Sequence, residues 1–250
     1  MEKSEIIVYD SGIGGLSVLK ELNKSVSSQN IMYFGDNKNA PYGNLNKNQL
    51  FHLVVKNLSR FVGKNTKLII FACNTLSATI RREIENFFNV KTIGVFPNVE
   101  SEICKGRKVL LLGTKATASK YKNDKNLTSL GLKDLAFDIE KNVFSLDKVD
   151  VKKHIETALN EHCLFYHNLV FDSVILGCTH YYFVKNKIID HLKPRFLTGG
   201  NDFCVKETKK HIKNHKTLEK TYKNNIIFLG ENADYNKFIF EKVVNRWLYL

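Results

Sequence analysis

The chain has 250 residues, of which 43% are hydrophobic and 25% are charged, a composition typical of a soluble globular protein with a sizeable core. Its formal net charge is +13, but the lysines are scattered and often alternate with asparagine, so nucleic-acid binding is not the function that we expect. No apolar run approaches the roughly 20 residues of a membrane helix, and the N-terminus lacks the apolar stretch of a signal peptide, which argues against a membrane partner.

Apolar runs alternate with amphipathic stretches along the chain. We expect strands at Glu5–Tyr9, Ile31–Phe34, Lys67–Ala72, Lys108–Leu112, Ser173–Gly177 and Asn225–Leu229. We expect helices at Leu16–Asn23, Lys47–Val62, Leu76–Phe88, Val151–Tyr166, Val184–Leu192 and Ala233–Trp247. Strands with almost continuous apolar sequence that alternate with helices are typical of an α/β fold with mainly parallel sheets.

The two halves of the chain repeat one arrangement of motifs. The first half reads strand, DSGIGG, helix, then strand, ACNT, helix, and the second half reads strand, GTKAT, helix, then strand, GCTH, helix. Ligands of open parallel sheets bind outside the carboxyl ends of the strands, where all four motifs lie. We therefore predict two similar α/β lobes, residues 1–97 plus 210–250 and residues 98–209, with the active site in the cleft between them.

Cys73 and Cys178 each follow an apolar strand and precede a predicted helix. A helix N-terminus favours negative charge, which lowers the pKa of a thiol and attracts a carboxylate. The two cysteines therefore predict one substrate held between two acid/base groups. Buried structural cysteines or a zinc site with His180 are the alternatives, although no recognisable set of four zinc ligands accompanies them.

Polar residues surround both cysteines in the sequence. Asn74 or Thr75 is expected to cap the helix after Cys73 and to bind a ligand, and His180 is expected to tune Cys178 or to bind a substrate carboxylate. The DSGIGG segment predicts a turn whose N–H groups face an anion, and its glycine spacing differs from a dinucleotide fingerprint. The PYGN segment predicts a turn in which a substrate approaches the main chain.

The other cysteines follow no such pattern. Cys104, Cys163 and Cys204 are assigned to packing. Five cysteines are an odd number, which suits free thiols in a reducing cytoplasm, so we expect a cytoplasmic protein.

Taken together and in this order, DSGIGGLSVL, GDNKNAPYG, ACNTLSA, LGTKATASKY and ILGCTHY resemble glutamate racemase, of the cofactor-independent, two-cysteine Asp/Glu racemase family. The resemblance implies an enzyme with two α/β lobes, usually a homodimer, that uses neither a cofactor nor a metal. It implies interconversion of L- and D-glutamate by 1,1-proton transfer between two thiols. It also implies a role in peptidoglycan synthesis, and so in cell wall biogenesis and cell shape.

The resemblance also implies roles for individual residues. Cys73 and Cys178 are the paired acid/base thiols, with Asp10 assisting Cys73 and His180 assisting Cys178. The positions that match substrate-binding residues of the family are Asp10, Ser11, Tyr42, Gly43, Asn74, Thr75, Thr114, Thr117, Thr179 and His180.

The chain departs from the family pattern at Asn39, at Tyr182 and in a longer segment. The F-V-P-x-x-E-E segment, whose glutamate supports the histidine, is not recognisable, and NVFSLDKVD in its place offers Asp147 or Asp150 as that carboxylate. Two alternatives stay open: a racemase or isomerase of this architecture for aspartate or a related dicarboxylate, and a catalytically weakened scaffold protein.

Overall fold

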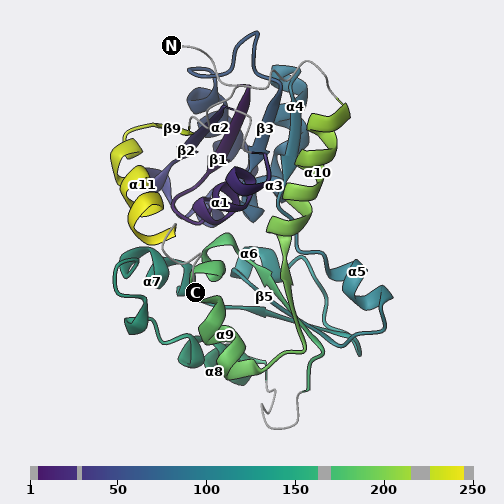
Figure 1. Ribbon diagram of the computed structural model, residues 1–250. Helices are drawn as coiled ribbons and strands as arrows, with labels where there is room; N and C mark the ends of the chain where they lie inside the picture. Colours follow the sequence, from purple (N-terminus) through teal and green to yellow (C-terminus); the bar gives the residue numbers. More distant parts are fainter. Residues whose placement is uncertain (1–4, 27–29, 163–169, 215–225, 245–250) are drawn as a thin grey trace. The chain divides into compact units, whose positions relative to one another are not determined.

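The computed structural model describes residues 5–26, 30–162, 170–214 and 226–244 (Figure 1). The chain forms two compact units, the first made of Met1–Val95 with Asn201–Leu250 and the second of Phe96–Gly200. The lobe boundaries expected after residues 97 and 209 stay a prediction. Among the described helices, none combines the length and the apolar character that crossing a membrane requires.

The first unit contains a five-stranded sheet in the order β4-β3-β1-β2-β9, in which every neighbouring pair is parallel. Its strands are β1 (Ile6–Asp10), β2 (Ile31–Gly35), β3 (Leu68–Phe71), β4 (Lys91–Gly94) and β9 (Ile226–Leu229). Every residue of β1, β2 and β3 is buried, which explains their almost continuous apolar sequence.

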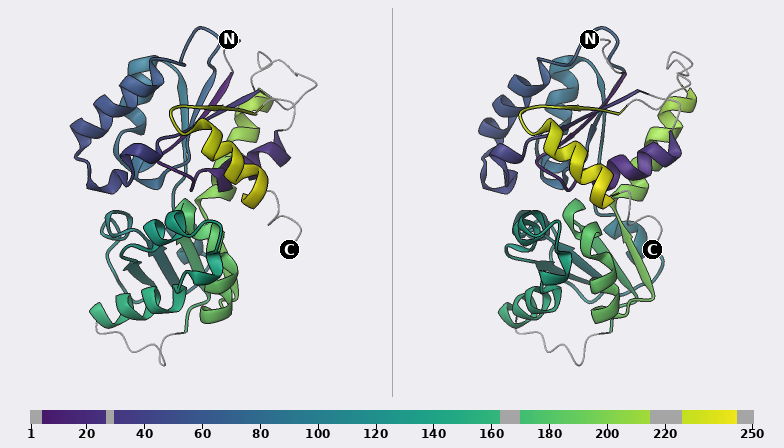
Figure 2. Two further views of the ribbon diagram at one scale, coloured as in Figure 1. Left: turned by 90° about the vertical axis from the view of Figure 1, so that its left-hand side faces the viewer. Right: turned by 60° about the vertical axis from the view of Figure 1, so that its left-hand side comes forward.

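Helices flank this sheet (Figures 1 and 2). The α-helices of the first unit are α1 (Leu16–Ser25), α2 (Lys47–Leu58), α3 (Asn74–Thr79), α4 (Arg81–Phe88), α10 (Gly200–Asn214) and α11 (Ala233–Ile239). Two 3₁₀ turns (Asn37–Asn39 and Tyr42–Asn44) and a π-helical turn (Phe240–Val244) complete it. The single helix predicted over Leu76–Phe88 is wrong, because the chain leaves helical geometry at Ile80 (φ −133°, ψ 3°) and forms α3 and α4.

The second unit contains a four-stranded parallel sheet in the order β6-β5-β7-β8. Its strands are β5 (Val109–Gly113), β6 (Leu127–Gly131), β7 (Ser173–Gly177) and β8 (Phe196–Gly199). Its helices are α5 (Val99–Cys104), α6 (Lys115–Ala118), α7 (Leu135–Lys141), α8 (Val151–Glu161) and α9 (Lys185–Leu192), with 3₁₀ turns at Leu146–Lys148 and Thr179–Val184. The predicted α/β class with parallel sheets is thus confirmed in both units.

The sequence analysis missed three strands, β4, β6 and β8. Each carries polar residues within a short segment, KTIG, LTSLG and FLTG, and each lies at an edge of its sheet. An edge strand buries less side-chain surface than a central one, so its sequence carries a weaker apolar pattern. Asn225 and the predicted helix ends at Tyr166 and Trp247 lie outside the described residues.

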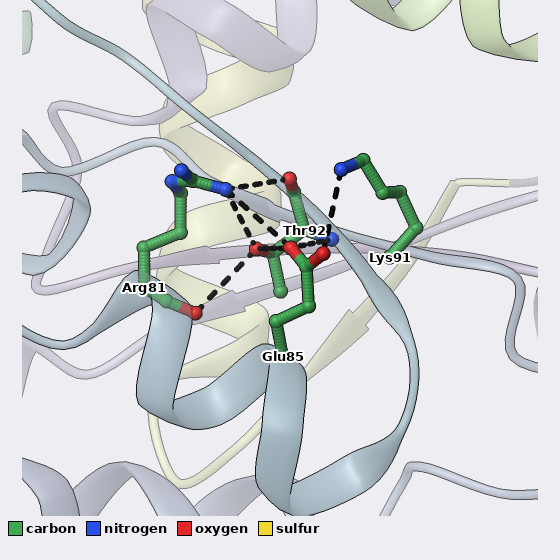
Figure 3. Close-up of polar contacts among 4 residues, drawn as sticks. All are labelled: Arg81, Glu85, Lys91 and Thr92. Carbon is green, nitrogen blue, oxygen red and sulfur yellow. Dashed lines mark hydrogen bonds and ion pairs between the residues drawn. The ribbon is translucent and has the colours of Figure 1, made fainter.

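A polar cluster joins helix α4 to the edge strand β4 (Figure 3). Arg81 donates hydrogen bonds to the carbonyl and the hydroxyl of Thr92, both at 3.1 Å. The Glu85 carboxylate accepts from the Thr92 N–H at 3.0 Å and from its hydroxyl at 2.5 Å, and Lys91 pairs with the same carboxylate at 3.4 Å. Because Glu85 occupies a main-chain donor of the edge strand, the cluster blocks pairing with another strand there.

A second cluster joins the amino ends of the strands in the other unit. The buried Glu102 carboxylate accepts from Lys105 at 2.6 Å, from Arg107 at 2.5 Å and from the Ser173 hydroxyl at 2.8 Å. The Arg107 guanidinium carbon also lies 3.4 Å from the centre of the Phe196 ring. Burial by itself raises the pKa of Glu102, but the three hydrogen bonds outweigh it and lower the pKa to about 2.

Replacing Glu102 with glutamine is expected to lower the free energy of unfolding at pH 7 by roughly 2 to 3 kcal/mol. A carboxyl whose pKa is depressed by folding stabilises the folded state above its ordinary pKa of 4.5, and this contribution is lost as the pH falls toward about 2. Denaturant unfolding at several pH values measures it. The control is Glu83→Gln, which breaks an exposed ion pair with Lys47 and should change stability by less than about 1 kcal/mol. Equal losses in both variants would contradict this expectation.

Candidate active site

In each unit, neighbouring parallel strands end next to polar motifs. In the first unit β1 ends at Asp10, which begins DSGIGG, and its neighbour β3 leads into Cys73. In the second unit β5 leads into Thr114 and its neighbour β7 leads into Cys178. The motifs predicted to share a sheet edge therefore do so, within each unit.

Cys73 is buried in the first unit, with 8% of its surface exposed. Its neighbour Ser11, from the turn after β1, directs its hydroxyl at the sulfur, with 3.7 Å between Oγ and Sγ. Cys73 itself occupies the position before helix α3. A hydroxyl in this position can donate a hydrogen bond to the sulfur when the thiol has lost its proton.

Asp10 is fully buried and shapes the DSGIGG turn. One of its carboxylate oxygens accepts from the N–H groups of Gly12 at 3.1 Å and Gly15 at 2.8 Å. A side chain at Gly15 would lie within 2.6 Å of the Asp10 Cβ and 2.9 Å of the Ala72 Cβ, so glycine is required there. Asp10 therefore fixes the main chain that presents Ser11 to Cys73.

Asn74 and Thr75 begin helix α3, and the prediction that one of them caps this helix is wrong. Cys73 is the N-cap residue, and no side chain among the described residues caps the helix. Asn74 is buried, and its amide oxygen has no hydrogen-bond partner among the residues that the structure describes. A buried acceptor of this kind is suited to a hydrogen-bond donor on a ligand.

The Tyr42 side chain belongs to a buried hydrogen-bond network that the sequence analysis missed. Its hydroxyl donates to Asp36 at 2.5 Å and lies 2.9 Å from the Tyr9 hydroxyl, and the Asn57 amide donates to both Asp36 and Tyr9. Burial, with Tyr9 and Asp36 beside it, raises the pKa of Tyr42 far above its ordinary value. The hydroxyl thus anchors the turn, and the neighbouring Gly43 is exposed.

Thr114 and Thr117 form a small turn after β5. The Thr114 hydroxyl accepts from the Thr117 N–H at 3.3 Å and lies 3.2 Å from the Thr117 hydroxyl, so Thr114 caps helix α6. The Tyr181 hydroxyl donates to the Gly113 carbonyl at 3.1 Å. This bond ties the turn to the segment that follows Cys178.

Cys178 is buried, with 7% of its surface exposed, and precedes a 3₁₀ turn (Thr179–Val184) that continues into α9. The buried Thr179 follows it directly. The ring of His180 lies against the sulfur, with 3.7 Å between Nδ1 and Sγ. The other ring nitrogen, Nε2, lies 2.6 Å from a carboxylate oxygen of Glu140 on helix α7.

The carboxylate that supports His180 is therefore Glu140, and the predictions of Asp147 or Asp150 are wrong. Asp150 instead caps helix α8 by accepting from the Lys153 N–H at 3.0 Å. The signal for Glu140 was present in AFDIEK, where the acid directly follows the buried Ile139. AFDIEK does not have the F-V-P-x-x-E-E pattern, so that pattern does not mark Glu140.

The Glu140 contact determines how the His180 ring is protonated. Because a carboxylate only accepts hydrogen bonds, Nε2 carries a hydrogen. Nδ1 then accepts from the Cys178 thiol, or donates to the sulfur once the thiol proton has moved onto the ring. Burial lowers the pKa of His180, but its hydrogen bonds and charge interactions with Cys178 and Glu140 outweigh burial and raise it well above 6.5.

The remaining cysteines have different surroundings. Cys204 is fully buried, and burial raises its pKa to about 12, which confirms its assignment to packing. Cys104 is exposed, so its assignment to packing is wrong. Cys163 lies outside the described residues.

No family model matches the chain, but curated proteins named glutamate racemase are similar to it over most of its length. It is 29% identical over 223 residues to a glutamate racemase of Clostridium botulinum, covering 84% of each chain. It is 28% identical over 251 residues to a glutamate racemase of Clostridium novyi, covering 95% of this chain and 94% of the relative.

Solved structures give the same result for the fold. A glutamate racemase isoform from Bacillus anthracis matches with a TM-score of 0.75 and 25% identity, covering 100% of this chain and 96% of the other. A glutamate racemase from Thermus thermophilus, solved with β-chloro-D-alanine, matches with a TM-score of 0.76 and 24% identity, covering 96% of this chain and 92% of the other. The chain therefore has the fold of the Asp/Glu racemase family, and the resemblance to glutamate racemase that its motifs indicate is confirmed.

Proposed function

We propose that this protein interconverts L- and D-glutamate without a cofactor, by 1,1-proton transfer between two thiols. The observation that carries the proposal is the equivalence of Cys73 and Cys178. Each is a buried thiol that lies within two residues of the end of a parallel strand, and each has a hydrogen-bonding group 3.7 Å from its sulfur. The two sulfurs act on opposite faces of one substrate in this mechanism.

In each direction one cysteine, as thiolate, removes the α-proton, and the other, as thiol, delivers a proton to the opposite face. The α-proton is far less acidic than a thiol, whose pKa is roughly 8.5, so the site has to stabilise a carbanion-like transition state. We assign this task to hydrogen bonds from Asn74, Thr75 and Thr179 and from main-chain N–H groups. Ser11 and His180 complement the thiolate charge on their respective sides.

The choice of glutamate follows the name of the relatives and the match of Thr114 and Thr117 to substrate-binding positions of the family. D-glutamate made by this reaction would supply peptidoglycan synthesis. A homodimer and a cytoplasmic location, where thiols stay reduced, complete the proposal.

The test is a circular-dichroism assay of each glutamate enantiomer with purified, reduced protein and no added cofactor. We expect the optical signal of both enantiomers to decay to zero, with deuterium from the solvent incorporated at the α-carbon. The matched substrates are D- and L-aspartate. Faster decay with aspartate would replace glutamate by the shorter dicarboxylate, and no decay with any amino acid would overturn the proposal in favour of a scaffold protein.

A further inference from the structure

Helix α7 carries Glu140 and packs against the Thr179–Val184 turn that contains His180. It has seven residues, of which Leu135 and Ile139 are buried, while the Phe137 side chain is 63% exposed. Its N-cap residue Asp134 lies in the left-handed region (φ 60°), and none of the described side chains caps it. Helices this short are marginal without tertiary contacts, so the position of Glu140 depends on what fastens α7.

His154 of helix α8 contacts helix α7 at Asp138 and the segment before that helix at Lys133. Its Nδ1 lies 2.8 Å from the carbonyl oxygen of Lys133, just before the helix, and its Nε2 lies 2.8 Å from a carboxylate oxygen of Asp138. A carbonyl oxygen and a carboxylate oxygen both accept hydrogen bonds, so the imidazole is the donor group of this arrangement. The imidazole thereby connects helix α8 to the residues on both sides of the N-terminus of α7.

Asp138 and Glu140 lie on the same helix but contact different histidines. Residues two apart point in directions about 200° apart, because successive residues of an α-helix turn by about 100°. Asp138 accordingly contacts His154 of α8, while Glu140 contacts His180 at 2.6 Å. A shift of α7 at Asp138 therefore moves the carboxylate that orients the His180 ring.

The link between helices α7 and α8 is hydrogen-bonded to helix α9, which follows Cys178 in the chain. Lys187, on helix α9, donates to the carbonyl oxygens of Asp147 and Val149, both at 2.8 Å. These carbonyls lie in the link between α7 and α8, and α9 continues the 3₁₀ turn that contains His180. Helix α8 thus begins at a point that is fixed relative to His180.

We propose that His154 and Asp138 form a clasp that positions Glu140, and through it His180, for proton transfer at Cys178. The inference rests on the proposed function and adds two positioning residues to it. Both act through Glu140, so the clasp serves the Cys178 side of the reaction.

The experiment compares Asp138→Ala, His154→Ala and the double variant with the wild-type protein. Alanine has the highest helix propensity, so each change removes the side-chain contact at little cost in intrinsic helix propensity. We expect each single variant to lower kcat by about 5- to 30-fold with KM changed by less than about twofold, since a small misplacement near the chemistry costs up to about 100-fold. We expect the double variant to be no slower than the slower single variant, because the two residues share one interaction.

The matched control is His162→Ala. His162 ends the same helix α8, and its ring nitrogen contacts a carbonyl of that helix, Ala158, at 3.0 Å. We expect it to retain the wild-type kcat. Should the alanine variants fail to fold, as judged by thermal unfolding, Asp138→Asn and His154→Gln replace them in the same comparison.

Isotope effects separate positioning from a general loss of structure. If the step at Cys178 is slowed, the kinetic isotope effect of α-deuterated substrate should increase for the enantiomer that Cys178 deprotonates. For the other enantiomer, to which Cys178 delivers the proton, the solvent isotope effect should increase. Unchanged kcat in both single variants, or equal isotope changes in both directions, would overturn the clasp while leaving the racemase proposal intact. Absence of racemisation by the wild-type protein would overturn both.

Discussion

Replacing either Cys73 or Cys178 with serine is expected to lower racemisation of both glutamate enantiomers by at least about 1000-fold. A serine hydroxyl is a far weaker acid than a thiol, so it neither forms the base nor delivers the proton at a useful rate, and acid/base groups contribute about 100- to 10,000-fold each. Circular dichroism with each enantiomer measures the loss. Both substitutions are tested, because a two-thiol mechanism requires that each variant lose racemisation of L-glutamate as well as of D-glutamate.

The control for these variants is Cys104→Ser. Cys104 is exposed at the end of α5 and should leave the rate unchanged. Each active-site variant retains one thiol, which can still exchange the α-proton of one enantiomer with solvent deuterium. We therefore expect slow exchange with one enantiomer in the Cys73 variant and with the other enantiomer in the Cys178 variant. Full racemisation by either variant would refute the two-thiol mechanism.

Replacing Glu140 with glutamine is expected to lower kcat by about 10- to 100-fold, the loss typical when a residue that orients a functional histidine through its other ring nitrogen is replaced. Glu140 contributes to the raised pKa of His180 through its hydrogen bond and its charge, so the variant should lower that pKa. Titration of the His180 ring by nuclear magnetic resonance measures this change directly. Asp147→Asn, at the position that the sequence suggested, should leave both kcat and the His180 titration unchanged.

The same pair makes folding stability depend on pH. A histidine whose pKa is raised by folding contributes stability that is fully present below its ordinary pKa of about 6.5 and is lost as the pH rises through the raised value. Glu140→Gln should therefore destabilise the protein most at mildly acidic pH, above the ordinary glutamate pKa of about 4.3, with the difference from wild type shrinking as the pH rises further. A difference that grows with rising pH would contradict the assigned direction.

By itself, the sequence determined the fold class, the central strands and the two thiols. The central strands, such as β1 and β7, are buried along their whole length, so their sequence had to be apolar throughout. A cysteine within two residues of the end of such a strand is a local signal, and it marks both Cys73 and Cys178. Ser11, Asn74 and His180 were found because they lie within two residues of a strand end or a thiol.

Only the tertiary structure decided which distant side chains complete each arrangement. Glu140 lies 40 residues from His180, and Asn57 lies 48 residues from Tyr9, so no local pattern links either pair. The edge strands β4, β6 and β8 and the break at Ile80 also escaped the sequence, because packing against neighbours outweighed weak local preferences. The residues proposed to carry the chemistry could therefore be predicted from local sequence. Their orienting partners could not, because sheet and helix packing brings those partners together from distant parts of the chain.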